Sequence, residues 1–283
     1  MTKTLSKAIK LGLIGDNISR SKSPKLHRTA GQLAGLEVTY DRLIPKDLDL
    51  TFDETFEQAR LTGFRGINVT YPYKEQVAAQ VMISDPLVKA IGAVNTVVFT
   101  PDGPQGYNTD YSGFMAAYSA IMGETSPGTV SLIGTGGVGK AVAFGLLGLK
   151  ATTVRCVDLD VPKATALANA LRNAGTETQI EIATDPVEAA KGADGIINCT
   201  PLGMVGIGGT PLPRAAMVDA MWAFDAVYTP VETEFLQNAV AQGLTVISGY
   251  ELFFGQGIDA WHIFTGVELD TAALRTAIQE DET

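Results

Sequence analysis

Short apolar runs alternate with amphipathic stretches along the first third of the chain. The apolar runs have the length of buried strands and lie at residues 11–15, 38–44, 66–70 and 93–100. Between them, hydrophobic residues recur at helical spacing over residues 24–36, 52–61 and 74–81. Ser23 is placed to cap the first of these helices, and Pro101-Asp102-Gly103 predicts a turn into one more strand. Strands that alternate with helices predict a largely parallel sheet with helices on its faces.

A turn-rich cluster at residues 123–128 separates this region from a second alternation of the same kind. From there on, six apolar runs predict strands, at residues 129–134, 152–158, 179–184, 192–200, 223–228 and 244–248. Helical patterns begin at Lys140 and Pro162, and we expect the aromatic-rich segment from Gln256 to pack on the first domain. The sequence therefore predicts an α/β fold with two domains. One is a substrate domain over residues 1–122, with 250–283 packing back on it, and the other a Rossmann-type, doubly wound domain over 123–249.

Charge and composition exclude several classes of protein. Lys and Arg number 21 against 31 Asp and Glu, and the net charge of −10 disfavours binding to nucleic acid. The longest apolar run, Ala141–Leu149, is too short to cross a membrane, and we expect no signal peptide. The two cysteines, Cys156 and Cys199, cannot make a disulfide framework. Together with the two histidines, His27 and His262, they match no familiar zinc-site spacing. We therefore expect no bound metal and a reduced, cytoplasmic setting.

A glycine-rich string follows the strand predicted at residues 129–134. Gly134-Thr-Gly136-Gly137-Val138-Gly139 matches G-x-G-x-x-G, a pattern that is weak by itself in a chain with 30 glycines. In such a turn Gly134 permits the tight bend, Gly136 lets the backbone approach a pyrophosphate, and Gly139 lets helix and strand pack closely. The amides at the helix start, at Gly137 and Val138, then bind phosphate. The alternative is a glycine-rich turn without a ligand.

Asp158 strengthens the dinucleotide interpretation, because it ends the next strand 24 residues after Gly134. A carboxylate there accepts hydrogen bonds from both ribose hydroxyls of NAD and repels the 2′-phosphate of NADP. No basic residue adjoins Asp158, and Lys163 one turn later reads as a solvated helix residue within reach of a ribose. The sequence therefore favours NAD over NADP.

The loop that follows the strand ending at Asn198 is a further candidate site. It lies at a carboxyl strand end, where open α/β sheets bind their ligands. Thr200 and Met204 are placed to border the nicotinamide, although a plain connecting loop explains the residues almost as well.

Polar strings interrupt the apolar pattern of the first domain at Ser19–Pro24, Asn68–Lys74, Asn95 and Asn108–Asp110. Clustered hydroxyl, amide, amine and carboxylate groups suit a small, many-hydroxylated ligand, because each buried polar group needs a partner. Seven strings together resemble the shikimate dehydrogenase family; they occur in the family's order and cover essentially the whole chain. They are SRSKSP, GINVTYPYK, GAVNT, NTD, GTGGVG, DAVYTP and FFGQG.

The resemblance implies a hydride transfer that interconverts the 3-hydroxyl and 3-keto forms of a ring acid such as shikimate or quinate. It assigns Lys74 and Asp110 as the catalytic pair, with Lys74 exchanging the proton of the reacting hydroxyl and Asp110 orienting it. It assigns the remaining substrate contacts to Ser21 and Ser23 for the carboxylate, to Asn68, Thr70, Asn95 and Gln256 for hydroxyls or carboxylate, and to Tyr228 beside the nicotinamide. Without the resemblance, each residue has an ordinary structural explanation. The serines would cap a helix, the asparagines would form turns, and Lys74 would be an exposed lysine at the start of a helix.

Two departures from the family pattern bear on cofactor and substrate. Asp158-Leu-Asp160 stands where biosynthetic members usually carry Asn-Arg-Thr or Asn-Arg-Ser, which resembles the NAD-using quinate/shikimate branch. Glu251 lies in a bulkier, more acidic string than the family usually shows, and its role stays open, as does that of Lys163.

The sequence leaves several alternative functions open. They are a paralogue acting on a related cyclic acid such as aminoshikimate, a non-catalytic NAD-binding sensor and, more distantly, a folate-type dehydrogenase. Quinate against shikimate, reaction direction and monomer against homodimer also stay open.

Overall fold

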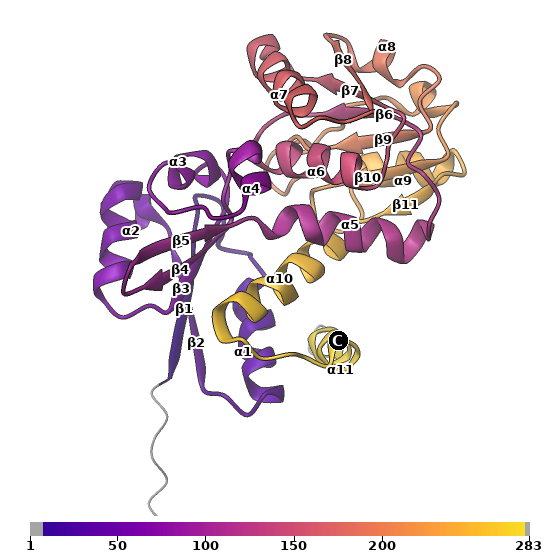
Figure 1. Cartoon of the computed structure of the whole chain (residues 1–283). Coiled ribbons are helices and arrows are strands. Elements are labelled where there is room, and N and C mark those ends of the chain that lie inside the picture. Colours follow the sequence, from indigo (N-terminus) through magenta and orange to yellow (C-terminus); the bar gives the residue numbers. More distant parts are fainter. Residues whose placement is uncertain (1–7, 281–283) are drawn as a thin grey trace, which may run out of the picture. The chain divides into compact units, whose positions relative to one another are not determined.

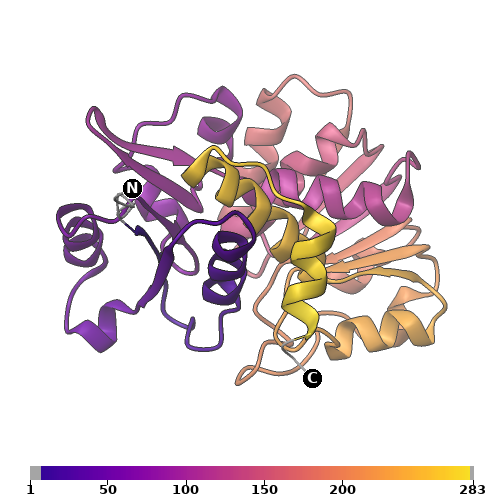
Figure 2. The same cartoon turned by 90° about the horizontal axis from the view of Figure 1, so that it is seen from below.

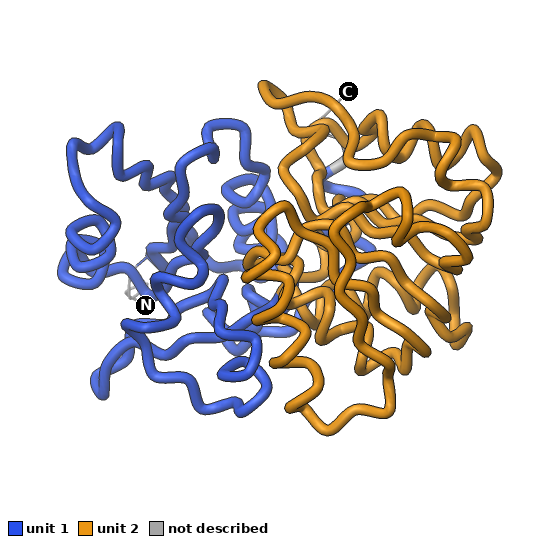
Figure 3. Tube along the Cα trace, turned by 90° about the horizontal axis from the view of Figure 1, so that it is seen from above, with its two compact units in different colours: residues 1–109, 257–283 blue, residues 110–256 orange. Residues whose placement is uncertain are grey.

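The computed structural model describes residues 8–280 and divides into two compact units (Figure 3). The first unit takes the chain up to Thr109 and again from Gly257 onward, and the second takes Asp110–Gln256. Each unit is a mixed α/β structure with one sheet, so the expected α/β class is confirmed. The expected domain limits stay a prediction; the contact-defined units change at Asp110 rather than in the turn at residues 123–128.

The sheet of the first unit has five strands in the order β2-β1-β3-β4-β5 (Figure 1). They are β1 (Ile9–Ile14), β2 (Val38–Leu43), β3 (Gly66–Val69), β4 (Thr96–Thr100) and β5 (Gly103–Tyr107). The first three are parallel, whereas β4 and β5 form an antiparallel hairpin. The sheet is thus less parallel than the sequence predicts, because the turn at Pro101-Asp102 brings β5 directly back beside β4.

Helices cover both faces of this sheet. On one face, α2 (Phe52–Leu61), α3 (Lys74–Ala78) and α4 (Pro86–Ile91) pack apolar residues onto β1, β3 and β4. On the other face, the end of α10 (Gly249–Thr265) packs Ala260 and Phe264 against Leu11 and Leu13. The last helix, α11 (Thr271–Glu280), lies beside α1 (Ser23–Leu33), as Figure 2 shows, and Lys25 Nζ donates to the Ile278 carbonyl at 2.5 Å.

The sheet of the second unit has six parallel strands in the order β11-β10-β9-β6-β7-β8. They are β6 (Thr129–Ile133), β7 (Thr153–Val157), β8 (Gln179–Ala183), β9 (Gly195–Asn198), β10 (Trp222–Asp225) and β11 (Thr245–Ile247). Numbered within the unit, this is the order 3-2-1-4-5-6 of a Rossmann fold, in which the strand order reverses between β6 and β9. The predicted Rossmann-type domain is confirmed.

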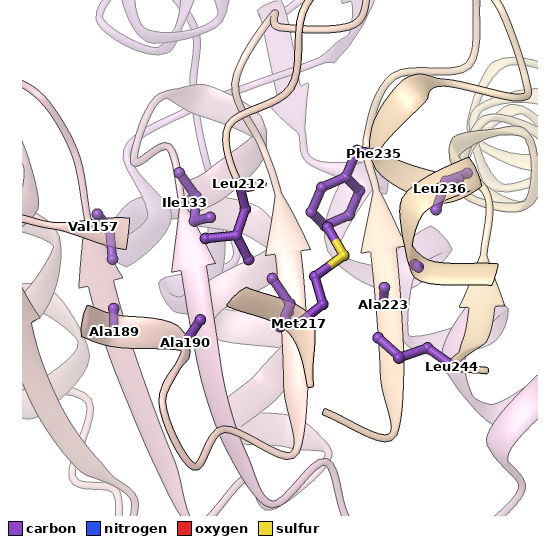
Figure 4. Close-up of a cluster of buried hydrophobic side chains, with 12 residues drawn as sticks. Ile133, Val157, Ala189, Ala190, Leu212, Met217, Ala223, Phe235, Leu236 and Leu244 are labelled. Carbon is purple, nitrogen blue, oxygen red and sulfur yellow. The ribbon is translucent and has the colours of Figure 1, made fainter. Parts of the chain in front are cut away.

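Apolar layers flank this sheet on both sides. On the face drawn in Figure 4, α8 (Pro186–Ala190) and α9 (Glu234–Ala241) pack with Ile133, Ile196 and Ala223. On the opposite face, α6 (Gly137–Gly148) contacts both α5 (Thr109–Met122) and α7 (Val161–Asn173). Short 3-10 helices at Pro45–Leu48 and Arg214–Met217 complete the elements. Within residues 8–280, no helix combines the length and hydrophobicity needed to cross a membrane.

Two local expectations are wrong. Ser23 does not cap α1: the capping position is Lys22, and the Ser23 amide instead donates to Ser21 Oγ at 3.3 Å. The helix expected from Lys140 begins three residues earlier, at Gly137, because the glycine turn itself supplies its first turn.

Candidate active site

In the first unit, the polar strings meet at one edge of the sheet. β1 ends at Ile14 and β3 at Val69, and both parallel strands present their carboxyl ends there. β4 runs the other way, so its first residue, Thr96, pairs with Asn68, and the last residue of β5 pairs with Thr96 in turn. The topology therefore collects Asn68–Lys74, Asn95 and the segment after β5 at a single edge.

Asn68 is held by a network of buried polar groups at this edge. Tyr40 Oη donates to Asn68 Oδ1 at 2.8 Å, and Asn68 Nδ2 donates to Thr96 Oγ1 at 3.0 Å and to the Asn95 carbonyl at 3.3 Å. His27 stacks on Tyr40 with ring centroids 4.9 Å apart. Burial lowers the pKa of His27 to about 3, against the opposing effect of its hydrogen bond to Asn68, so His27 is neutral. The direction of the Asn68 amide is thereby defined.

Asn95 ties the start of β4 to the end of the NTD string. Its Oδ1 accepts from the Thr109 amide at 2.8 Å and from Thr96 Oγ1 at 3.0 Å, while Nδ2 donates to Thr109 Oγ1 at 3.0 Å. Asn95 is 3% exposed, so these bonds are shielded from water. Asp110 is the next residue in the chain, and its backbone therefore starts from an anchored position.

Thr70 begins the turn that leads from β3 to α3, and Lys74 is the first residue of α3. The Thr70 amide donates to the Ile14 carbonyl at 2.9 Å, and the Tyr73 amide donates to the Thr70 carbonyl at 2.9 Å. The Lys74 carbonyl accepts from the Val94 amide at 2.9 Å, one residue before Asn95. The backbone of Lys74 is therefore fixed beside the Asn95 segment.

The two serines expected to hold a carboxylate are neighbours in space as well as in sequence. Ser21 Oγ and Ser23 Oγ lie 3.2 Å apart, and both residues are 8% exposed. The Ser21 amide donates to the Ile18 carbonyl at 2.9 Å, which folds the segment after β1 into a turn. The pair thus offers two adjacent hydroxyl donors at the start of α1.

In the second unit, the glycine turn has the geometry that a dinucleotide needs. Gly134 adopts φ +97°, and a Cβ there would lie 2.7 Å from the backbone of Cys199. A Cβ on Gly139 would lie 2.0 Å from the Gly134 carbonyl oxygen, so strand and helix approach through these two glycines. A Cβ on Gly136, by contrast, would meet nothing within 4 Å. The turn therefore leaves open space at Gly136, in front of the first amides of α6, and the residues fit a pyrophosphate.

Asp158 is anchored directly to the glycine turn. Its Oδ2 accepts from the Thr135 amide at 2.8 Å and from Thr135 Oγ1 at 2.7 Å, and Oδ1 accepts from the Asp160 amide at 3.0 Å. Partial burial works to raise the pKa of Asp158, but the hydrogen bonds from Asp160 and Thr135 outweigh it and hold the pKa below its ordinary value. Lys163 instead lies 3.8 Å from Asp160 Oδ2, in an exposed ion pair. The end of β7 thus carries a fixed negative charge.

Beside the glycine turn, Asn198 and Asp225 end the neighbouring strands β9 and β10. Asn198 Oδ1 accepts from the Thr200 amide at 2.9 Å and from Thr200 Oγ1 at 2.7 Å. Asn198 Nδ2 donates to Asp225 Oδ1 at 3.0 Å. Burial raises the pKa of Asp225 to about 6, against the opposing effect of its hydrogen bonds to Thr233, Val227 and Asn198.

Tyr228, Gln256 and Asp110 are linked through α5 and α10. The Tyr228 ring stacks on Phe253 with centroids 4.8 Å apart, and Gln256 Nε2 donates to the Phe253 carbonyl at 2.9 Å. A Cβ on Gly113, one turn after Asp110, would lie 2.8 Å from the Gln256 amide nitrogen. The second unit therefore brings the start of α5, one turn after Asp110, against the part of α10 that carries Gln256 and contacts Tyr228.

Known proteins resemble this chain over nearly its full length. A quinate/shikimate dehydrogenase (NAD(+)) of Corynebacterium efficiens is 37% identical over 274 residues, covering 95% of this chain and 96% of the relative. The chain belongs to the shikimate dehydrogenase family. A family model described as the shikimate dehydrogenase substrate binding domain matches residues 13–97.

Other members of the shikimate dehydrogenase family differ in the cofactor they are named for. A shikimate dehydrogenase (NADP(+)) of Pseudarthrobacter chlorophenolicus is 36% identical, covering 95% of this chain and 94% of the relative. Among solved structures, quinate dehydrogenase from Corynebacterium glutamicum in complex with NAD matches with a TM-score of 0.87 and 32% identity. That match covers 97% of this chain and 100% of the other. The family assignment made from the seven strings is confirmed.

The sequence did not single out several buried polar residues that organise the two half-sites, one on each unit. Tyr40, on which His27 stacks, orients Asn68, and Asn198 and Asp225 shape the loops after β9 and β10. His27 sits on a predicted helix and Tyr40 inside a predicted strand, where neither residue differs from ordinary core. The signal for Asn198 and Asp225 is their position, since each is a polar residue ending an apolar strand. The roles expected of the individual site residues stay predictions.

Proposed function

We propose that this chain interconverts the 3-hydroxyl and 3-keto forms of quinate or shikimate by hydride transfer, with NAD as its preferred dinucleotide. The observation that carries the proposal is the pair of half-sites. A glycine turn with open space at Gly136 lies on one unit, and an edge rich in buried hydroxyl and amide groups lies on the other. A nicotinamide dinucleotide suits the first half-site and a polyhydroxylated ring acid suits the second. Full-length similarity to a quinate/shikimate dehydrogenase supports both.

The preference for NAD is supported by Asp158. Its carboxylate is anchored by Thr135 and ionised over a wide pH range, so it would repel a 2′-phosphate and accept hydrogen bonds from ribose hydroxyls. The next side chain, Leu159, is fully exposed and carries no charge. The relative named for NAD(+) and the structure that contains NAD support the same preference. Because other relatives are named for NADP(+), the preference for NAD is proposed for this chain and not for the whole family.

For the chemistry, a bound nicotinamide would accept or return the hydride at its C4 atom. Lys74 would take the proton of the ring hydroxyl during oxidation and return it during reduction, and Asp110 would orient the amine. Two anchored segments support this pairing. The Lys74 carbonyl is bonded to Val94, and Thr109, which precedes Asp110, is bonded to Asn95. Ser21 and Ser23 would hold the ring carboxylate, with Asn68, Thr70, Asn95 and Gln256 on the hydroxyls or carboxylate and Tyr228 beside the nicotinamide.

Initial rates with quinate, shikimate and aminoshikimate, each with NAD and NADP, test the proposal. We expect turnover with quinate or shikimate and a higher kcat/KM with NAD. Turnover restricted to aminoshikimate or another cyclic acid would support the alternative that this chain is a paralogue acting on a related acid. NAD binding without turnover on any of these acids would favour the sensor alternative.

A further inference from the structure

Asn198 and Asp225 are buried polar partners at the carboxyl edge of the second sheet. They are the last residues of β9 and β10, they pair with each other in the parallel register, and both are 0% exposed. Burying a carboxylate and an amide is costly unless each of their polar atoms is satisfied. What their hydrogen bonds hold in place therefore indicates why they are there.

Asn198 organises the loop after β9. Its Oδ1 receives both the amide and the hydroxyl of Thr200, and its Nδ2 donates to the Leu202 carbonyl at 3.0 Å and to Asp225 Oδ1 at 3.0 Å. All the hydrogen-bonding capacity of the amide is thus spent on bending the chain at Thr200 and on contacting its partner.

Asp225 organises the segment after β10. Its Oδ1 also accepts from the Val227 amide at 2.9 Å, and its Oδ2 accepts from Thr233 Oγ1 at 2.5 Å. Thr233 in turn caps α9 through the Leu236 amide. One carboxylate thus closes the loop of residues 226–233, and an ionised carboxyl group, which only accepts, satisfies all three donors.

The two loops contact each other and the glycine turn. The Val205 amide donates to the Thr229 carbonyl at 3.1 Å, and a Cβ on Gly203 would lie 3.4 Å from the Thr233 side chain. A Cβ on Gly134 would lie 2.8 Å from the Thr200 amide nitrogen. A displacement at Asp225 would therefore reach Thr200, Met204 and Tyr228, the three residues expected beside the nicotinamide.

We infer that Asn198 and Asp225 are positioning residues that set the two loops at the nicotinamide end of the cofactor site. This inference rests on the proposed function for the identity of the cofactor. The pyrophosphate would lie at the glycine turn, which ends β6, and the adenosine at Asp158, which follows β7 on the side of β6 away from β9. The Asn198–Asp225 pair thus bears on how the reacting ring is oriented more than on how tightly the dinucleotide binds.

The test compares the wild-type chain with Asp225→Asn and Asn198→Ala, and with Asp194→Asn as the matched control. Asp194 accepts from the Thr129 amide at 2.7 Å at the opposite edge of the same sheet. For the two loop variants we expect kcat with the best ring acid to fall about tenfold to a hundredfold, and the Kd of NAD to stay within about threefold. The control should keep kcat within about twofold. If the loop variants retain full kcat, or lose NAD affinity and kcat in parallel, the inference is overturned.

Hydrogen exchange separates this inference from the proposed function, because it needs no substrate. In Asp225→Asn the amides of Thr200, Leu202 and Val227 should exchange at least about tenfold faster than in the wild type, with the glycine turn unchanged. Unchanged exchange at these amides overturns the inference, even if the wild type proves to be a dehydrogenase. If exchange is faster in Asp225→Asn but the wild type turns over none of the ring acids, the two-loop organisation is retained and the proposed function is removed. Should Asp225→Asn fail to fold, Thr233→Val removes one donor and is expected to shift exchange and kcat in the same direction.

Discussion

The hydroxyl of Tyr40, on β2, reaches past β1 to donate to Asn68 on β3 at 2.8 Å. The two residues pair with Leu11 and Leu13 of β1, which places Gly12 between their levels. Asn68 is one of the groups expected to bind the ring acid, so this bond connects a buried strand of the core with substrate recognition.

Replacing Tyr40 with Phe tests this connection. The Asn68 amide would lose one of the groups that define its direction, and we expect KM for the ring acid to rise about threefold to tenfold, with the Kd of NAD unchanged. Tyr118→Phe is the control, because it also removes a hydroxyl, one that donates to the Thr125 carbonyl in the second unit. Equal KM values for Tyr40→Phe and wild type would show that Asn68 needs no such support.

His27 predicts a pH dependence of stability. Its pKa is lowered to about 3 in the folded chain by burial, and His27 Nδ1 has no hydrogen-bond partner among the described residues. The unfolded chain takes up a proton near pH 6.5, whereas the folded chain does not. The stabilisation is therefore fully present above pH 6.5 and is lost as the pH falls towards 3, by several kcal/mol. We expect the melting temperature of wild type to fall more between pH 7 and 4.5 than that of His27→Phe; parallel curves would contradict the neutral histidine.

The glycine turn predicts opposite outcomes for two small substitutions. A Cβ on Gly136 enters open space, so Gly136→Ala should leave the melting temperature nearly unchanged while raising the Kd of NAD by at least about tenfold. A Cβ on Gly139 would lie 2.0 Å from the Gly134 carbonyl oxygen, so Gly139→Ala should destabilise the fold itself. Differential scanning calorimetry with a dinucleotide titration distinguishes them. Undiminished NAD binding by Gly136→Ala would place the pyrophosphate elsewhere.

Asp158 predicts cofactor selectivity. Asp158→Asn removes the charge that would repel a 2′-phosphate, and we expect the ratio of kcat/KM for NAD to that for NADP to fall at least about tenfold. Asp160→Asn is the control, since Asp160 is exposed and caps α7 through the Lys163 amide, a role that Asn can also fill. The same change of ratio in both variants would assign selectivity to the general acidity of the loop rather than to Asp158.

Much of the architecture could be predicted because strand and helix periods are local properties of the sequence. The α2 limits, Phe52–Leu61, agree to the residue, since a Thr51–Glu54 capping box marks the start of that helix. The Ser23 cap was wrong because Ser21, two residues earlier, takes the amide, which is a matter of backbone path rather than residue type. The antiparallel pairing of β4 with β3 depends on where the chain re-enters the sheet after α4, which local patterns do not specify.

The sequence named the residues of the candidate site more readily than the hydrogen bonds that organise them. The seven strings identified the family, yet nothing in the sequence pairs Tyr40 with Asn68 or Asn198 with Asp225, because each pair joins strands that are 27 or 28 residues apart. Such bonds depend on strand order and register, which periodicity does not specify.

Whether the chain is a quinate or shikimate dehydrogenase that uses Lys74 is tested by initial rates with quinate and shikimate, each with NAD and NADP, for the wild type and for Lys74→Ala. We expect turnover of at least one of these acids, a higher kcat/KM with NAD, and a loss of at least about a hundredfold in kcat in the variant with NAD binding retained. No turnover of either acid with either dinucleotide, or a Lys74→Ala variant as active as the wild type, would contradict this expectation.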